Sequence, residues 1–315
     1  MRILFAGSPA IAVPTLKMLC NKKGVELISV LTNPDSPKGR HGASQPTEAG
    51  EAAAEAVIPT LKPVKLDAPL REQVSRLKPD LLVSFAYGRI FGPKFLALFP
   101  LGGVNIHPSL LPKYRGPSPV QAAILNRDTV TGITIQTLAP EMDSGDILSQ
   151  KQLQLTGGET AESLSGTIAI TASVMLNDLL QSIEDGTVTR TPQNHSEASY
   201  CSVFSKEDGL INWQDSAAQI EARIRAFNPW PLCRTYHKEK ELIILKATPF
   251  REDHEKKESV LQAGKVLGID KNNGILIQTG NGILCVSELQ YQGKKALMWK
   301  DFLNGARDFD GSQLG

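Results

Sequence analysis

The chain has 315 residues, of which 41% are hydrophobic and 21% charged, and its formal net charge is +1 at pH 7. This length is sufficient for two domains, and the composition is that of a globular protein rather than a disordered one. Because the net charge is near zero, the protein as a whole does not carry the positive potential that attracts nucleic acids. A nucleic-acid partner would therefore have to bind a local basic patch.

The cysteines and the N-terminal residues indicate the compartment. No two cysteines have C-x-x-C spacing, which argues against a disulfide framework or a zinc site and for free thiols in a reducing compartment. The chain enters an apolar strand directly, without the pattern of a signal peptide, and no apolar run approaches membrane-spanning length. We therefore expect a cytoplasmic protein. The four cysteines are Cys20, Cys201, Cys233 and Cys285.

The first 31 residues alternate between strand and helix patterns. Residues 3–6 are apolar and predict a buried strand, Gly7-Ser8-Pro9 predicts a turn, and a helix follows before a second strand at 26–31. This order predicts an α/β fold with a doubly wound, mainly parallel, Rossmann-like sheet. The glycine pattern lacks G-x-G-x-x-G, so a dinucleotide site has little support.

Residues 33–50 are rich in proline, glycine and serine, and we expect a long loop without regular structure. Lys38 and Arg40 lie in this loop. Helices are predicted at 47–57 and 68–77. A continuous apolar run at 81–85 predicts a strand that is buried on both faces, as in a parallel sheet.

Asn105 and His107 lie two residues apart on a predicted strand, 103–107, so both side chains point to the same face. An amide and an imidazole at the carboxyl end of a parallel strand lie where α/β enzymes place their chemistry. The loop that follows contains Ser109, Leu110, Leu111 and Pro112. It is stiff and largely apolar, and we expect it to grip a flat ring.

Asp143 lies in a glycine-containing turn, 142–146, after a predicted helix at 117–125 and a predicted strand at 133–138. Together with Asn105 and His107 it would provide donors for a developing oxyanion and an acceptor for a proton. Taken singly, His107 is more often a core histidine and Asp143 a turn residue. The carboxylates are not spaced as metal ligands, so no metal is predicted.

The remaining chain changes character after a long helix predicted at 160–183. Residues 188–205 are polar and irregular and are predicted to link a catalytic domain, 1–187, to a second domain, 206–315. Short strands separated by turn signals predict that the second domain is a small antiparallel β-barrel of the OB type.

Two details of the second domain matter for function. A helix predicted at 216–227 is stopped by the prolines of Phe227-Asn228-Pro229-Trp230-Pro231, and we expect Phe227 and Trp230 to pack across the domain junction. The pair Lys294 and Lys295 lies in a predicted turn between strands.

The run from Asn105 to Gly116, followed by the Asp143 turn, resembles the 10-formyltetrahydrofolate-dependent formyltransferases. Gly7-Ser8-Pro9, the Arg40 loop, Ala86-Tyr87-Gly88 and the Phe-Asn-Pro-Trp-Pro run extend this resemblance over the full chain. They make the chain most similar to the methionyl-tRNA formyltransferases within that family. The Arg40 loop departs from the family pattern, which usually has further lysines after this arginine.

The resemblance implies catalysis by Asn105, protonated His107 and Asp143. It implies folate binding by two groups of residues, the four of the Ser109 loop and the pair Tyr87 and Gly88. It implies contact of Lys38 and Arg40 with the acceptor end of tRNA, and Lys294 and Lys295 are our candidates for the tRNA-facing surface of the second domain. The expected reaction moves a formyl group from 10-formyltetrahydrofolate to the methionyl amine of initiator Met-tRNA, in a monomer and without a membrane partner.

Three alternatives stay open. Glycinamide ribonucleotide formyltransferases share most of the central run, but they lack a second domain of this length. Formyltransferases acting on an amino-sugar nucleotide are the serious competitor, because they can carry a similar second domain. A silent folate-binding or RNA-binding protein is also conceivable, although it would have no use for an intact set of Asn105, His107 and Asp143.

Overall fold

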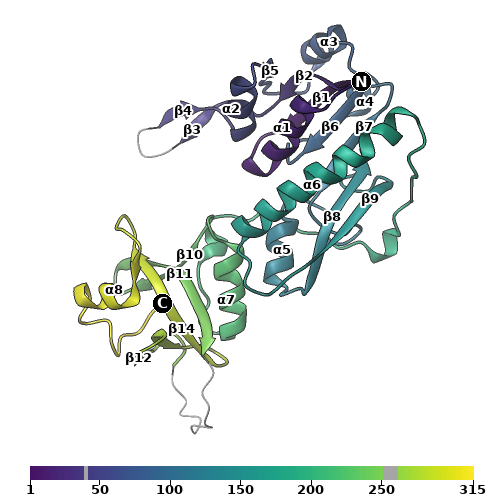
Figure 1. The fold of residues 1–315 in the computed structure, drawn as a ribbon. Coiled ribbons are helices and arrows are strands. Elements are labelled where there is room, and N and C mark those ends of the chain that lie inside the picture. Colours follow the sequence, from purple (N-terminus) through teal and green to yellow (C-terminus); the bar gives the residue numbers. More distant parts are fainter. Residues whose placement is uncertain (39–41, 251–261) are drawn as a thin grey trace. The chain divides into compact units, whose positions relative to one another are not determined.

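The structure, a computed structural model, describes residues 1–38, 42–250 and 262–315. They form two compact units (Figure 1). Unit 1 comprises Met1–Pro119, Val130–Gln154 and Leu164–Ser202, and unit 2 comprises Val120–Thr129, Leu155–Ser163 and Val203–Gly315.

The strands and helices are as follows. The strands are β1 Arg2–Gly7, β2 Glu26–Leu31, β3 Ser36–Lys38, β4 Ala43–Gln45, β5 Thr60–Leu61, β6 Leu81–Phe85, β7 Gly103–His107, β8 Val130–Thr137, β9 Ile147–Gln154, β10 Cys233–His237, β11 Lys240–Phe250, β12 Val266–Asp270, β13 Gly274–Gln278, β14 Ile283–Tyr291 and β15 Leu297–Met298. The α-helices are α1 Val13–Asn21, α2 Glu48–Glu55, α3 Ala68–Arg76, α4 Pro93–Leu96, α5 Pro119–Leu125, α6 Ala161–Glu184, α7 Ala217–Ala226 and α8 Trp299–Gly305.

Unit 1 contains a seven-stranded sheet in the order β5-β2-β1-β6-β7-β8-β9. The pairings from β5 to β7 are parallel, whereas β8 pairs antiparallel with both β7 and β9. The predicted doubly wound, mainly parallel sheet is therefore confirmed. The strand order reverses between β1 and β6, and the crevice at the carboxyl ends of such strands is the usual ligand site of this fold.

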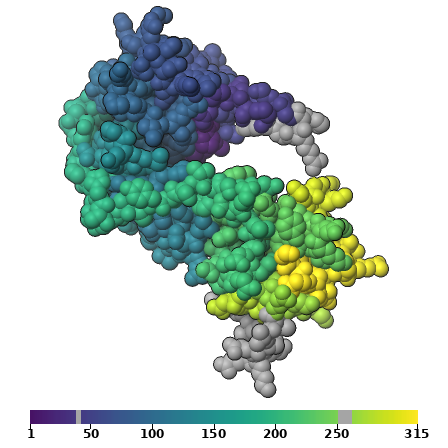
Figure 2. Space-filling model, turned by 180° about the vertical axis from the view of Figure 1, so that it is seen from behind, coloured from purple at the N-terminus to yellow at the C-terminus, as the bar shows by residue number. Residues whose placement is uncertain are grey.

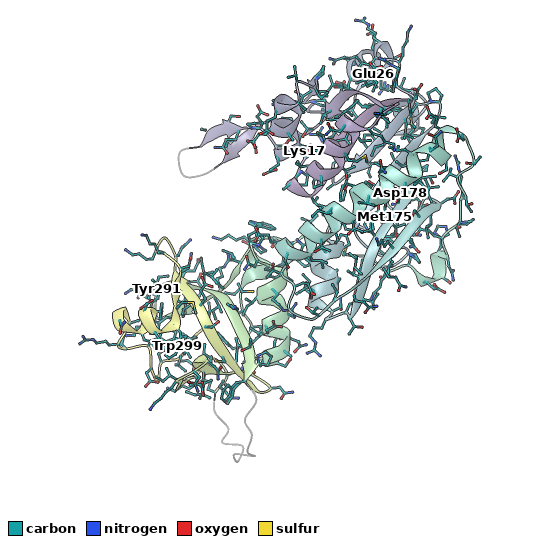
Figure 3. The ribbon with its side chains drawn as sticks, viewed as in Figure 1. Lys17, Glu26, Met175, Asp178, Tyr291 and Trp299 are labelled. Atoms are coloured by element: carbon teal, nitrogen blue, oxygen red, sulfur yellow. The ribbon has the colours of Figure 1, made fainter. Side chains whose placement is uncertain are left out.

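Apolar residues fill both faces of this sheet. On one face, Leu4 and Leu82 pack with an aromatic ladder whose members are stacked or tilted and buried; the ladder is Tyr87, Phe91, Phe95 and Phe99. Helix α6 lies beside α1. Lys22 Nζ, at the end of α1, donates to Asn177 Oδ1 of α6 at 2.9 Å. Lys17 of α1 and Met175 of α6 are labelled in Figure 3.

Helix α6 is long and apolar enough to cross a membrane by length and composition, contrary to the expectation that no segment approaches that length. Its inward residues are buried in unit 1, however: Ile168, Leu176 and Leu180 have no exposed surface. Polar residues such as Asp178 interrupt its outer side (Figure 3). Since a helix with one buried face and one mixed face fits a packed domain, we interpret α6 as a core helix.

The structure differs from the predicted elements in two places. Residues 33–50 are not one irregular loop, because β3 and β4 form an antiparallel hairpin within it. Pro37 is tolerated there because a two-stranded hairpin has no third strand that needs its missing N–H. Strand β9 has no counterpart among the predicted elements, because most of its residues are polar and partly or fully exposed and it lacks the apolar run that predicts a strand.

Unit 2 contains an antiparallel sheet in the order β10-β11-β14-β13-β12, with β15 paired to β14. This confirms that the second domain is built on an antiparallel sheet. Among its described strands, β10 and β12 form the two edges of that sheet. Helix α7 starts with a capping box made by Ser216 and Gln219 and buries Ile220 and Ile224. The light-green to yellow residues of unit 2 lie together in the space-filling view (Figure 2).

Aromatic side chains complete unit 2. Tyr291 of β14 contacts Phe302 of α8, with ring centroids 5.1 Å apart, and Trp299 at the start of α8 is buried (Figure 3). Phe227 is buried against Phe204, as expected of a packing residue. Trp230 is 57% exposed.

Candidate active site

The register of the sheet places Asn105 and His107 on one face. Asn105 pairs with Gln136 of β8, and His107 pairs with Thr134. Because paired residues on neighbouring strands point to the same side, Gln136 faces the same space as Asn105. The predicted pair thus gains a glutamine from an adjacent strand.

Asp143 is directed onto this face by the turn after β8. Its φ angle is 53°, in the left-handed region that Asp tolerates better than most residues. Oδ1 accepts hydrogen bonds from Gln136 Nε2 at 2.9 Å and Asn105 Nδ2 at 3.3 Å, and Oδ2 accepts one from the Gly116 N–H at 2.8 Å. Three donors therefore hold the carboxyl group in place.

His107 is 4% exposed, and each ring nitrogen faces a protein oxygen. Nε2 lies 2.8 Å from Tyr114 O, and Nδ1 lies 3.5 Å from Asp143 Oδ1. A carbonyl can only accept, so Nε2 carries a proton. Burial lowers the pKa of His107, against the opposing effect of the Asp143 carboxylate. A neutral resting imidazole is therefore favoured over the expected protonated one, and a proton that arrives at Nδ1 would be shared with Asp143.

A cavity of about 400 Å³ opens beside these groups. Asn105, His107 and Asp143 all contribute to its wall, together with Tyr87 and Gly88 from the turn after β6. It therefore lies at the carboxyl ends of β6 and β7, where the fold predicts a ligand. The other wall residues are mainly apolar, including Ile90, Phe91, Leu138 and Met142.

The Ser109–Pro112 loop is placed differently from the other predicted folate residues. None of its four residues lines the cavity. Ser109 and Leu111 are buried, and Leu111 N–H donates to Thr134 Oγ1 at 3.0 Å. Leu111 O accepts from Gln150 Nε2 at 2.8 Å. In this structure the loop is fixed against β8 and β9, and Leu110 packs close to Gly132.

Three buried polar residues near Asp143 were not among the predicted site residues. They are Gln136 of β8, Arg115 in the active loop (residues 108–116, after β7) and Gln193 in the predicted linker. Gln136 could have been suspected from its place on a strand next to the Asp143 turn. Gln193 is 50 residues from Asp143 in the chain, and no local pattern predicts that contact.

The predicted tRNA-contacting residues lie in both units. Lys38 ends strand β3, and Arg40 lies outside the described residues. Lys294 and Lys295 are exposed in the turn between β14 and β15, as predicted. Among residues 1–38, 42–250 and 262–315, no group of three His, Cys, Asp or Glu side chains is placed to hold a metal ion.

Two family models match most of the chain, and full-length relatives are similar to it. The model of the formyl transferase family matches residues 1–180, and that of the formyl transferase C-terminal domain matches residues 204–307. The methionyl-tRNA formyltransferase of Treponema denticola is 49% identical over 317 aligned positions, which cover 98% of both chains. That of Borrelia hermsii is 41% identical over 99% of both chains.

Solved structures of lower identity share the fold. An N-formyltransferase from Helicobacter canadensis, in complex with folinic acid and dTDP-3-aminofucose, aligns with a TM-score of 0.64 at 22% identity, covering 90% of this chain and 98% of that one. HypX from Aquifex aeolicus, in complex with tetrahydrofolic acid, aligns with a TM-score of 0.60 at 18% identity, covering 96% of this chain and 47% of that one.

Proposed function

We propose that this chain, which belongs to the formyl transferase family, transfers the formyl group of 10-formyltetrahydrofolate to the α-amino group of initiator Met-tRNA. The product, N-formylmethionyl-tRNA, serves translation initiation. The observation that carries the proposal is the convergence of Asn105, His107 and Asp143 on one cavity, in a chain that matches methionyl-tRNA formyltransferases over nearly its whole length.

The site supports the following reaction course. The methionyl amine attacks the formyl carbon, and a C–N bond forms as the carbonyl oxygen becomes an oxyanion. Asn105 Nδ2, which has a second N–H beyond the one directed at Asp143, donates to that oxyanion. The pair His107 and Asp143 accepts the amine proton, and the imidazolium that results stabilises the adjacent negative charge.

Collapse of the intermediate completes the transfer. The bond between the formyl carbon and the folate N10 breaks, and N10 takes up the proton that the pair held. The products are the formylated amine and tetrahydrofolate. No step requires a metal ion. That the reaction proceeds without a metal remains a prediction.

We assign the donor to the cavity described above. Tyr87 and Gly88 line it beside the catalytic groups, and its apolar wall suits the flat face of a folate ring. The family resemblance links the Ser109–Pro112 loop to folate. In our proposal the loop acts indirectly, by fixing the strand end that carries His107. The rest of the folate molecule, beyond the ring, would extend out of the cavity through its open side.

We assign the tRNA to two surfaces. Lys38 and Arg40 would contact the acceptor end, and Lys294 and Lys295 the phosphate backbone. Residues 206–315 are in this view the tRNA-binding domain, and 1–187 the formyltransferase domain. We expect a cytoplasmic monomer.

The test is a formylation assay with purified protein, labelled 10-formyltetrahydrofolate and Met-tRNA. We expect the label to be recovered as N-formylmethionine after mild base releases the amino acid from the tRNA. The Asp143→Asn variant is the control for adventitious transfer. Failure of the wild-type protein to label Met-tRNA would overturn the proposal.

A further inference from the structure

Gln193 lies beneath the Asp143 turn and has little exposed surface. Its Nε2 is close to three oxygens: Gly145 O at 2.7 Å, Asp143 O at 2.9 Å and Gln136 Oε1 at 3.2 Å. Its Oε1 accepts from Arg115 Nη2 at 2.7 Å and from Arg115 Nε at 3.2 Å. Both ends of this amide are thus fully used by buried partners.

Arg115 fixes which way the Gln193 amide points. A guanidinium has only N–H donors, so the side of Gln193 that faces it must be the oxygen. A reversed amide would set N–H against N–H at Arg115 and oxygen against three oxygens at the turn. Arg115 itself is 2% exposed and also contacts His195 Nδ1 at 3.1 Å and Tyr200 Oη at 3.3 Å.

The orientation of Gln193 in turn fixes Gln136. Because Gln136 Oε1 accepts from Gln193, its Nε2 must point the other way, and it donates to Asp143 Oδ1 at 2.9 Å. Arg115, Gln193, Gln136 and Asp143 therefore form one chain of hydrogen bonds with a single sense of donation. Such a chain holds a catalytic carboxylate in place without contacting the substrate.

Gln193 is carried by a segment whose main chain is hydrogen-bonded to β9 near one end and to the active loop near the other. In this 191–201 strap, Thr191 and Ile147 exchange two hydrogen bonds at 2.8 and 2.9 Å. Arg115 N–H donates to Ser199 O at 2.8 Å, and Cys201 N–H donates to Arg115 O at 2.8 Å. The strap is thereby fixed at both ends, with Gln193 between them.

We propose that Gln193 is a positioning residue for formyl transfer, which acts by holding Asp143 and its donor Gln136 in the reactive arrangement. This inference rests on the proposed function, because it assigns Gln193 a part in the same reaction. Because Gln193 would act through Asp143, the effect of replacing Gln193 on kcat should disappear when Asp143 no longer acts as a proton acceptor.

A double-mutant cycle tests this. Gln193→Met keeps the length of the side chain and removes both its donors and its acceptor. We expect kcat for Met-tRNA formylation to fall about 10-fold, with KM for the folate donor changed less than about threefold. In an Asp143→Asn background the same substitution should lower kcat by less than about twofold. Gln152→Met is the matched control, because Gln152 is an exposed glutamine of β9 in the same sheet, and it should leave kcat unchanged.

The outcomes separate the two proposals. A wild-type protein that does not formylate Met-tRNA overturns the proposed function. An Asp143→Asn variant with full kcat leaves that function intact, but it removes Asp143 from the mechanism and overturns the positioning role of Gln193 with it. If Asp143→Asn is impaired, but Gln193→Met either keeps wild-type kcat or loses as much in both backgrounds, Gln193 has no positioning role. Should Gln193→Met fail to fold, Gln193→Glu keeps the acceptor for Arg115 while removing the donors, and the same cycle applies to it.

Discussion

At the scale of single residues, the account depends on Asp143 as a proton acceptor held by three donors. Asp143→Asn keeps the shape of the side chain and removes its basicity. We expect kcat for Met-tRNA formylation to fall at least about 10²-fold, the usual scale for loss of a general base. Folate affinity, measured by fluorescence titration, should change little. Near-normal turnover would remove Asp143 from the mechanism.

Asn105 and His107 make a second prediction at this scale, because both act on the same developing charge. Asn105→Ala should lower kcat on the order of 10²-fold, the scale for losing one preorganised donor. His107→Ala should also impair turnover, and the double variant should lose less than the product of the two effects. Steady-state kinetics of the four proteins measures this. Fully multiplicative losses would mean that the two residues serve separate steps.

At the scale of elements, the site depends on close contact between the active loop and the 191–201 strap. Gly116 has a φ of +114°, and a Cβ there would lie 2.3 Å from Cys201 O. Gly116→Ala should therefore lower both the melting temperature and kcat, since Gly116 N–H also binds Asp143 Oδ2. A Tm and kcat equal to those of wild type would contradict the close contact.

Gly166 provides the control for that prediction. It lies in α6, and a Cβ added at this position would extend into open space. Gly166→Ala should be neutral or should stabilise the protein by up to about 1 kcal/mol, because alanine is the better helix former. Thermal unfolding of both variants, followed by circular dichroism, gives the comparison.

The elements also show how much of the fold and of the site could be predicted from the sequence. The period of two in residues 103–107 correctly predicts that Asn105 and His107 share a face, and apolar runs predict β1, β2 and β6. The partners of Asp143 could not be predicted in the same way. Gln136 lies on the strand just before the Asp143 turn, so its contact could have been suspected, but strand register decides which side it faces. Gln193 reaches the Asp143 turn from 50 residues away, in a segment that looks like a linker, and this long-range contact leaves no local pattern.

At the scale of the whole molecule, the near-neutral net charge means that few residues should account for tRNA affinity. Replacing exposed Lys294 and Lys295 by glutamine should weaken tRNA binding and reduce the slope of log affinity against log salt by about 1 to 2, since that slope scales with the phosphates neutralised. Filter binding at several salt concentrations measures both. The matched pair Lys17→Gln with Lys23→Gln, on exposed lysines of unit 1, should change neither. An unchanged slope in the first variant would move the tRNA surface elsewhere.

The most direct test of the central claim is the choice of acceptor. The protein is offered Met-tRNA, a 4-amino sugar nucleotide and glycinamide ribonucleotide in parallel, each with labelled 10-formyltetrahydrofolate, and kcat/KM is measured for each. A tRNA enzyme should prefer Met-tRNA by at least about 10³-fold, because only a substrate of that size can use contacts remote from the reacting amine. Arg40→Ala should reduce this preference. Faster formylation of the sugar nucleotide than of Met-tRNA, with both rates indifferent to Arg40→Ala, would contradict the account.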